Sequence, residues 1–370
     1  MKHRIVHITK ATGMYGSEKH LLTLLPALTR DYQVACIVLK ESKKPVDDYL
    51  HLLGSAGIEV YPLVADHDIV PRTFTQLRKL LCSITPAIVH THLIHGDVYG
   101  ILAATATGCR CIVSTRHNDD TFRRRLPVKI VNRLLARRIK TLIAISDWVA
   151  TFAHTVEGIP REKIITIHYG IDPPPCEHPA QSVRSALGLT EEHILCGITA
   201  RLVEQKGHHD LITAFALAAA QCPRLRLVIA GDGPLRSELE AQVRSHCPEG
   251  SVFFTGYRRD IGDVLASLDV FVHPSRWEGF GLAILEAMAL GIPVIGTRVS
   301  AIPELVGDAG ILVAPRDSAA LADAMVQLAR DPSLRHNLGR AAHLRYRTMF
   351  SVANMVEKTA AVYEALLARV

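Results

Sequence analysis

Residues Trp277–Met288, with the sequence WEGFGLAILEAM, decide how this chain folds. The preceding run Val270–Ser275 is an extended segment that ends at a proline, which predicts a buried strand. A turn with two glycines then leads into the helical run Leu282–Leu290. A buried strand, a tight turn and a helix start, in this order, are typical of a place where a ligand binds.

The turn offers a binding site for an anion. The backbone N–H groups of Gly281, Leu282 and Ala283 lie at the start of the predicted helix, where they have no partner within the helix and the helix dipole favours negative charge. Gly279 and Gly281 have no Cβ atom, so a ligand can approach the backbone closely. The turn therefore predicts a site for a phosphate group.

Two carboxylates flank this turn. Glu278 precedes the helix and Glu286 lies about one turn inside it, so each can accept hydrogen bonds from a separate set of hydroxyls. A sugar and a ribose would supply these hydroxyls. Two glutamates near a helix are also typical of an ordinary solvated face, but the glycines between them favour the ligand site.

The spacing of Glu278 and Glu286 around Gly-Phe-Gly-Leu resembles the signature of the retaining glycosyltransferases of family 4. The resemblance implies the GT-B fold, an α/β architecture of two facing Rossmann-like parallel-sheet domains with a C-terminal helix that crosses back to the first. It implies that Glu278 binds the hydroxyls of the transferred sugar and that Glu286 binds those of the ribose. Phe280, Gly281 and Leu282 would contact the donor.

The composition is that of a soluble protein with two domains. The chain has 370 residues and a net charge of +6. Charged residues interrupt every apolar run before the roughly 18 to 20 residues that a membrane-spanning helix needs. The N-terminal residues run directly into a predicted strand without an export signal, and the eight cysteines include no Cys-x-x-Cys pair. We therefore expect a cytoplasmic protein with reduced cysteines.

The first half of the chain alternates short apolar runs with amphipathic stretches. The predicted strands are Arg4–Ile8, Gln33–Leu39, Ala87–His90, Cys111–Ser114, Thr141–Ile145 and Ile164–His168. Strands that alternate with helices predict a parallel sheet with helices on both faces. We expect a Rossmann-like domain over residues 1–172, and the resemblance makes it the acceptor-side domain.

A glycine loop follows the first predicted strand. Gly13 and Gly16 precede the predicted helix Lys19–Leu28, and the N–H groups of this turn could meet a phosphate. The loop resembles the N-terminal glycine loop of the family, which implies a contact with the donor. An ordinary strand-to-helix turn is the alternative. The loop lacks the pattern Gly-x-Gly-x-x-Gly, so we expect no nicotinamide or flavin cofactor.

Histidines follow two of the predicted strands. His117 lies at the mouth of the predicted sheet and matches the family histidine that faces the transferred sugar, although a surface histidine after a strand is the alternative. His90, His92 and His95 have a spacing that could suit a metal ion. No carboxylate or cysteine cluster accompanies them, and the family has a similar pair there without metal, so we expect no metal.

A basic amphipathic helix is predicted over residues 123–138, with cations on one face and aliphatic residues on another. The cations are Arg125, Lys129, Arg133 and Arg137, and the aliphatic residues are Leu126, Ile130, Leu134 and Leu135. Such a helix can lie on an anionic membrane surface, where each cation contributes about 1 kcal/mol. Packing on the domain's own sheet is the alternative. No aromatic platform accompanies the charges, so we expect no nucleic acid.

A proline-rich linker over residues 173–181 divides the chain, because it favours neither a helix nor an inner strand. The strands predicted beyond it are Ile194–Thr199, Leu225–Ala230, Val252–Thr255, Val270–His273 and Pro293–Gly296. They predict a second Rossmann-like domain over residues 182–350, which the resemblance makes the donor domain. A C-terminal helix over residues 351–370 would return to the first domain.

Two cations follow the first strand of the second domain. Arg201 and Lys206 match the family pair that binds the donor pyrophosphate, and two solvated loop cations are the alternative. An arginine can donate to two phosphate oxygens, and a lysine adds a point charge. Gly231 lies in a further turn that allows close approach, and Tyr257 belongs to a segment that resembles the lining of the base pocket.

These residues predict retaining, metal-independent transfer of a sugar, with a hexose expected, from a nucleotide diphosphate donor to an acceptor hydroxyl between the two domains. His117, Glu278, Arg201 and Lys206 would be the catalytic residues. The basic helix favours a glycan or lipid-linked acceptor of the cell envelope at the inner face of the plasma membrane. A GT-B epimerase and a non-catalytic nucleotide-sugar-binding protein are the alternatives. The base, the sugar and the acceptor are not readable from the sequence.

Overall fold

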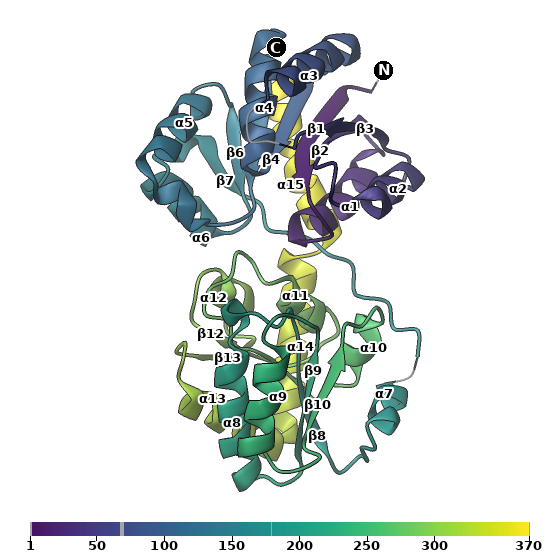
Figure 1. Cartoon of the computed structure of the whole chain (residues 1–370), viewed down its shortest axis with the longest axis vertical. Helices are drawn as coiled ribbons and strands as arrows, with labels where there is room; N and C mark the ends of the chain where they lie inside the picture. Colours follow the sequence, from purple (N-terminus) through teal and green to yellow (C-terminus); the bar gives the residue numbers. More distant parts are fainter. Residues whose placement is uncertain (1, 67–69, 179, 370) are drawn as a thin grey trace. The chain divides into compact units, whose positions relative to one another are not determined.

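The computed structural model describes residues 2–66, 70–178 and 180–369. These residues form two compact units, each built on a parallel sheet (Figure 1). Unit 1 comprises residues 1–170 and 351–370, and unit 2 comprises residues 171–350. The division therefore falls two residues before the predicted boundary at residue 172. Pro179, within the predicted linker, lies outside the described residues, and a helix begins directly after it at Ala180.

Unit 1 holds a seven-stranded parallel sheet in the order β3-β2-β1-β4-β5-β6-β7. The strands are β1 (Arg4–Ala11), β2 (Gln33–Lys40), β3 (Glu59–Val64), β4 (Ile88–His92), β5 (Ile112–Arg116), β6 (Thr141–Ala144) and β7 (Ile164–Thr166). The strand order reverses between β1 and β4, and ligands of open parallel sheets bind at the carboxyl ends beside such a reversal. His92, the last residue of β4, lies at this edge.

The helices of unit 1 cover both faces of this sheet. They are α1 (Gly16–Leu28), α2 (Asp47–Ser55), α3 (Pro71–Ile84), α4 (Leu93–Ala106), α5 (Leu126–Ala136), α6 (Asp147–Thr155) and α15 (Val352–Leu367), with the short 3-10 turns η1 (Thr121–Arg124) and η2 (Arg161–Lys163). The helix α1 begins three residues before the predicted Lys19, so Gly16 is its first residue.

The last helix, α15, belongs to unit 1 although it follows unit 2 in the sequence (Figure 1, yellow). The Ser351 side chain caps it by accepting a hydrogen bond from the Asn354 N–H at 3.3 Å. Met355 and Tyr363 are buried in the core of unit 1, and α15 packs against α1. Unit 1 is therefore completed by the end of the chain.

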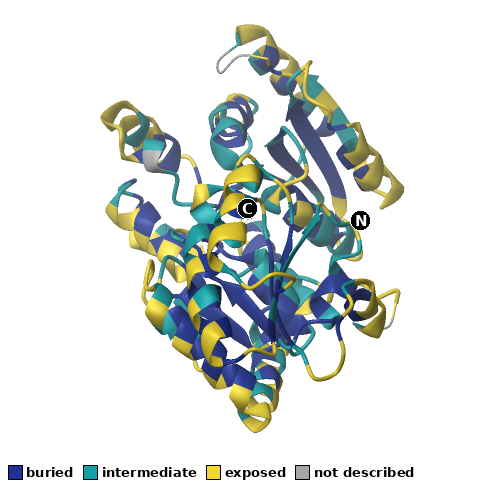
Figure 2. Ribbon diagram, turned by 60° about the horizontal axis from the view of Figure 1, so that its bottom comes forward, coloured by how far each residue is buried: buried dark blue, intermediate teal, exposed yellow. Residues whose placement is uncertain are grey.

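Unit 2 holds a six-stranded parallel sheet in the order β10-β9-β8-β11-β12-β13. The strands are β8 (Ile194–Thr199), β9 (Leu225–Ala230), β10 (Val252–Gly256), β11 (Val270–His273), β12 (Val294–Thr297) and β13 (Gly310–Val313). The helices are α7 (Ala180–Ala186), α8 (His208–Gln221), α9 (Arg236–His246), α10 (Ile261–Ala266), α11 (Leu282–Ala289), α12 (Ile302–Val306), α13 (Ser318–Arg330) and α14 (Pro332–Met349), with the 3-10 turn η3 (Glu204–Lys206). In both units the strands are mostly buried and the outer faces of the helices are exposed (Figure 2).

The sequence analysis missed two strands, β3 and β13. Each lies at one edge of its sheet, where one side of the strand has no neighbour. β3 contains Pro62 and is only partly buried, and three of the four residues of β13 are only partly buried, so both differ from the fully buried central strands. No helix in the described part of the chain is long and apolar enough to cross a membrane.

Candidate active site

In unit 2, two loops meet at the carboxyl ends of β8 and β11. Gly207 has a φ of +67°, and a Cβ atom there would lie 2.1 Å from the Pro274 carbonyl oxygen, so only glycine permits this approach. The Gln205 side chain donates a hydrogen bond to the Trp277 carbonyl at 3.0 Å. These contacts bring Lys206, at the end of η3, to Glu278.

The Glu278 carboxylate is the centre of this cluster. Its Oε2 atom pairs with the Lys206 ammonium and accepts a hydrogen bond from His273 Nε2 at 3.1 Å. The Ser275 hydroxyl lies 3.4 Å from the same oxygen, and the Glu278 N–H donates to the Ser300 hydroxyl at 3.2 Å. The orientation of the carboxylate is therefore fixed from several sides.

Glu278 is buried and ionised. Burial alone would raise its pKa, but the hydrogen bond from His273 and the charge of Lys206 outweigh burial and lower the pKa to about 2. The sequence analysis missed His273 and Ser275 as partners of Glu278. The sequence feature that could have revealed them is that these two polar residues flank Pro274 at the end of an otherwise apolar strand.

The helix α11 begins beside Glu278. Gly281 caps its N-terminus with a φ of +104°, and the first backbone hydrogen bonds of the helix come from the Ile284 and Leu285 N–H groups, at 2.9 and 3.3 Å from the Gly281 oxygen. The N–H groups of Leu282 and Ala283 precede these bonds. The turn thus has the geometry expected of an anion site at a helix N-terminus.

The other residues predicted to bind the donor lie in different surroundings. The Phe280 side chain is buried, with its ring 6.2 Å from that of Phe350, so it packs in the core of unit 2. Glu286 is half-buried on α11. Tyr257, directly after β10, is 76% exposed.

Arg201 lies on a loop that the chain holds close to the end of β9. A Cβ atom at Gly231 would lie 1.9 Å from the Ala200 carbonyl oxygen, and one at Gly233 would lie 2.4 Å from that of Leu202. Only glycines permit this contact between the two loops. The Arg201 side chain is exposed, so its guanidinium can reach a ligand.

The glycine loop of unit 1 is built around Glu18. The Tyr15 N–H donates to the Glu18 carboxylate at 3.2 Å and the Ser17 hydroxyl does so at 2.8 Å, which closes the first turn of α1. Burial raises the pKa of Glu18. The Tyr15 ring lies beside Gly13, where a Cβ atom would come within 2.9 Å of it, and Gly16 is partly exposed.

His117 follows β5 and is buried. Its Nε2 atom lies 3.0 Å from His92 Nδ1, and its Nδ1 atom is hydrogen-bonded to the Tyr169 hydroxyl. Burial, and to a smaller extent the neighbouring charges of His20 and Arg116, lower the pKa of His117 well below its usual value. The ring is therefore neutral.

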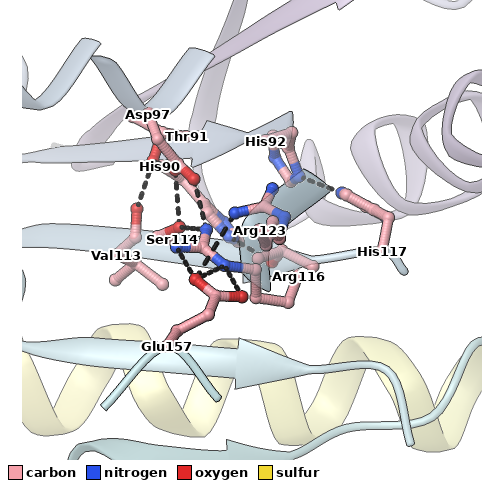
Figure 3. Close-up of polar contacts among 11 residues, drawn as sticks. His90, Thr91, His92, Asp97, Val113, Ser114, Arg116, His117, Arg123 and Glu157 are labelled. Carbon is pink, nitrogen blue, oxygen red and sulfur yellow. Dashed lines mark hydrogen bonds and ion pairs between the residues drawn. The ribbon is translucent and has the colours of Figure 1, made fainter. Parts of the chain in front are cut away.

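Arg116, directly before His117, is held by a buried network of charges (Figure 3). It pairs with Asp97 of α4, and its Nε atom donates to both oxygens of Glu157 at 3.2 and 3.1 Å. Arg123 also pairs with Glu157, at 3.4 Å. Arg123 belongs to the 3-10 turn η1 and is buried beside Glu157, whereas α5 begins only at Leu126, which corrects the predicted range of 123–138 for the basic helix.

The helix α5 exposes most of its aliphatic residues. Leu126 is 69% exposed and Leu134 is 53% exposed, and Ile130 is also exposed, whereas Leu135 is buried. Of the four aliphatic residues of the predicted apolar face, only Leu135 is therefore covered. Arg125 and Arg137 are exposed. Lys129 is partly buried, and the exposed Arg133 has its guanidinium against Gly158.

Both halves of the chain match known protein families. A model described as Glycosyltransferase Family 4 matches residues 14–174, and one described as Glycosyl transferases group 1 matches residues 193–331. The N-acetyl-alpha-D-glucosaminyl L-malate synthase of Bacillus anthracis is 30% identical over 292 residues, which are 76% of this chain and 75% of that protein. The chain belongs to the family 4 glycosyltransferases.

Two further likenesses extend over nearly the whole glycosyltransferase. The UDP-Gal:alpha-D-GlcNAc-diphosphoundecaprenol alpha-1,3-galactosyltransferase of Escherichia coli is 26% identical over 98% of this chain and 97% of its own length. The crystal structure of Anabaena HepE with UDP and glucose has a TM-score of 0.84 and 22% identity, covering 98% of this chain and 100% of that one. The predictions of a glycosyltransferase and of the GT-B fold are confirmed.

Proposed function

We propose that this glycosyltransferase moves a hexose from a nucleotide diphosphate donor to an acceptor hydroxyl, with retention of the anomeric configuration and without a metal ion. The observation that carries the proposal is the Lys206–Glu278 pair beside the N-terminus of α11. It combines an ionised carboxylate for sugar hydroxyls with positive charge for a pyrophosphate.

The main demand of the reaction is to stabilise the negative charge that develops on the leaving pyrophosphate. Arg201, Lys206 and the N–H groups of Leu282 and Ala283 supply hydrogen bonds and positive charge for it, which is the support for metal independence. Lys206 pairs with Glu278 in this structure. When the nucleotide sugar binds, some of the hydrogen bonds that the Lys206 ammonium donates would go to the pyrophosphate.

Glu278 would position the transferred sugar. Among the described residues, the side-chain partners of the Glu278 carboxylate all contact Oε2. Oε1 is therefore left to accept hydrogen bonds from sugar hydroxyls. The low pKa of Glu278 keeps the carboxylate an acceptor at neutral pH. Glu286 would accept the ribose hydroxyls, and Gly231 would let the nucleotide approach.

His117 of unit 1 would act on the far side of the sugar. The hydrogen bonds of His117 to His92 and Tyr169 fix the orientation of its ring. In the retaining step that the family resemblance implies, the donor phosphate itself accepts the proton of the acceptor hydroxyl, on the same face of the sugar that the phosphate leaves. The new glycosidic bond then forms as the bond to the phosphate breaks.

The acceptor would be a lipid-linked or envelope glycan at an anionic membrane surface. Exposed Leu126, Ile130 and Leu134 next to exposed Arg125 and Arg137 give α5 the two features of an interfacial helix, an apolar side and a basic side. Two relatives act on related acceptors by name: the Escherichia coli enzyme uses a diphosphoundecaprenol-linked acceptor, and a lipopolysaccharide core mannosyltransferase of Rhizobium meliloti is 32% identical over 64% of this chain.

Calorimetric titration with UDP, GDP and ADP in EDTA tests the donor site. We expect one nucleotide to bind with micromolar affinity, and UDP first, because the Escherichia coli relative uses UDP-galactose. Arg201→Ala should weaken this binding at least tenfold, since a charged hydrogen bond contributes about 1.5 to 3 kcal/mol.

Arg224→Ala is the matched control. Arg224 is also exposed but precedes β9, at the opposite end of the strands of unit 2, so its loss should leave nucleotide affinity unchanged. Absence of binding for every nucleotide in EDTA, with binding restored by Mg²⁺, would overturn metal independence. Equal losses in Arg201→Ala and Arg224→Ala would overturn the assignment of Arg201.

A further inference from the structure

A continuous row of hydrogen-bonded side chains crosses the sheet of unit 1. We call it the histidine relay. In order, its members are Thr115, His90, Tyr363, His7, His92, His117 and Tyr169. All of these residues are buried. The relay joins β1, β4, β5 and α15, so parts of the chain that are far apart in sequence meet in it.

The contacts within the relay run end to end, at 2.6 to 3.3 Å where a distance is given. His7 Nδ1 lies 2.9 Å from His92 Nε2, and His92 Nδ1 lies 3.0 Å from His117 Nε2. The Tyr363 hydroxyl lies 3.3 Å from His7 Nε2 and 2.6 Å from His90 Nδ1. His90 Nε2 lies 2.7 Å from the Thr115 hydroxyl. Each ring of the relay thus uses both of its nitrogens.

The rings are neutral, which restricts where their protons can be. Burial lowers the pKa of His7 to about 3 and lowers those of His90 and His92 well below the usual value. A neutral imidazole has one N–H and one acceptor nitrogen. A bond between two imidazole nitrogens needs a single proton, so a donor nitrogen must always face an acceptor nitrogen.

This restriction couples the tautomers of three rings. If Tyr363 donates to His7 Nε2, then His7, His92 and His117 must each carry the proton at Nδ1. If His7 Nε2 donates to Tyr363, all three must carry it at Nε2. Mixed states would leave either two protons or none in a buried bond, at the cost of an unmade hydrogen bond. The direction of the hydrogen bond between Tyr363 and His7 therefore determines which of the two tautomeric states the three rings adopt.

We propose that the histidine relay sets the tautomer and the ring orientation of His117, with His92, His7 and Tyr363 as positioning residues. This inference rests on the proposed function only for its effect on sugar transfer, and its effect on the tautomers stands independently. Tyr363 comes from α15, so the end of the chain takes part in orienting a residue that follows β5. In the proposed function, His117 is the member of the relay that faces the sugar.

A metal ion is the competing occupant of the same place. His7, His90 and His92 offer ligand atoms that all lie within 4.8 Å of one another. Two nitrogens on a tetrahedral Zn²⁺ lie about 3.3 Å apart, given Zn–N bonds of about 2.0 to 2.1 Å. His7 Nδ1 and His92 Nε2 are closer than this, at 2.9 Å, as a shared proton requires. The geometry favours the relay.

The direct test is a long-range proton–nitrogen NMR correlation on the full chain labelled with 15N-histidine. We expect His7, His92 and His117, assigned by single substitutions, to be neutral and to show one common tautomer. Different tautomers among the three, a charged ring at pH 7, or stoichiometric metal in the purified protein would each overturn the proposal. None of these readouts requires that the protein transfer a sugar.

Two tyrosine variants then test the role of the relay. Tyr363→Phe removes the hydroxyl whose hydrogen bond determines the tautomeric state. We therefore expect the NMR signals of His7 to change and sugar transfer to fall on the order of tenfold. Nucleotide affinity should stay unchanged. Tyr32→Phe is the control, because the Tyr32 ring packs 5.6 Å from that of Tyr363 and its buried hydroxyl has no partner among the described residues. Equal effects of both variants would reduce Tyr363 to a packing role.

Substitutions of His92 separate positioning from packing. The amide of His92→Asn can replace Nδ1 as the partner of His117, whereas His92→Leu cannot. We expect His92→Asn to recover a large part of the transfer that His92→Leu loses, at equal nucleotide affinity. Equal loss in both would contradict the proposal. A wild-type protein that shows the common tautomer but no transfer of any hexose would refute the proposed function and leave the relay intact.

Discussion

At the residue scale, the ion pair between Lys206 and Glu278 affects both the stability of the fold and the proposed sugar transfer. Both side chains are largely buried, so the loss of one partner leaves an uncompensated charge. We expect Lys206→Ala to lower the free energy of unfolding by about 3 kcal/mol. Transfer should fall at least a hundredfold, as is typical when a group that stabilises developing charge is removed (about 10² to 10³).

The double variant Lys206→Ala/Glu278→Gln separates these two effects. It removes both charges, so urea denaturation should show part of the lost stability restored, while initial rates of transfer remain low. Turnover at the wild-type rate in either Lys206→Ala or Glu278→Ala would exclude that residue from the reaction. A double variant less stable than both single variants would contradict the ion pair.

At the element scale, α5 shows that amphipathic periodicity does not reveal which face of a helix is covered. We expect Leu126→Ser/Leu134→Ser to weaken sedimentation with liposomes that contain anionic lipid, because two exposed apolar side chains could no longer insert. The matched control is Leu52→Ser/Leu102→Ser, which changes two leucines of similar exposure on α2 and α4.

The basic side of α5 is tested in the same assay. Replacement of Arg125, Lys129, Arg133 and Arg137 by serine should weaken binding and abolish its salt dependence, since each cation near the surface contributes about 1 kcal/mol. Replacement of the exposed cations Arg30, Arg72, Arg78 and Lys79 by serine removes the same charge elsewhere on unit 1. Unchanged binding in the α5 variants, or equal losses in the controls, would remove the membrane surface as a partner.

At the scale of the whole molecule, the two units should respond differently to acid. Burial lowers the pKa of five described histidines in unit 1 (His7, His20, His90, His92 and His117) but of two in unit 2 (His208 and His273). The unfolded chain takes up these protons below its pKa of about 6.5, and the folded chain does so only near 3 for His7 and His20. The stability from the neutral rings is therefore complete above about pH 6.5 and declines as the pH falls toward 3.

We expect unit 1 to lose stability more steeply than unit 2, by up to about 1.4 kcal/mol per pH unit for each histidine. The chain has two tryptophans, Trp148 in unit 1 and Trp277 in unit 2. Urea denaturation of Trp277→Phe and Trp148→Phe, followed by fluorescence at pH 7.5 and 5, therefore reports each unit separately. A parallel decline of both units would contradict the prediction.

The sequence predicted the turn and the start of α11 well because they are local. Glu278, Gly281 and the start of α11 lie within a few residues, and the turn places them together wherever the unit folds. Most central strands were also predicted, since buried parallel strands are continuous apolar runs. The two strands that were missed, β3 and β13, are edge strands and are only partly buried.

The histidine relay could not be predicted, because it depends on which strands are neighbours. His7 stands opposite His90 only because β1 pairs with β4, and the Tyr363 hydroxyl reaches His7 across 356 positions of sequence. In the same way, periodicity gave α5 an apolar face, but only tertiary structure left Leu126 and Leu134 exposed and turned Arg123 inward to Glu157.

The sequence by itself determined the two parallel sheets and the glycine turn with its flanking carboxylates, because burial period and turn geometry are properties of neighbouring residues. Only the tertiary structure decided how the partners of His117 are ordered and which surfaces are covered. Those depend on strand order and on the return of α15, which bring together residues that no local pattern connects.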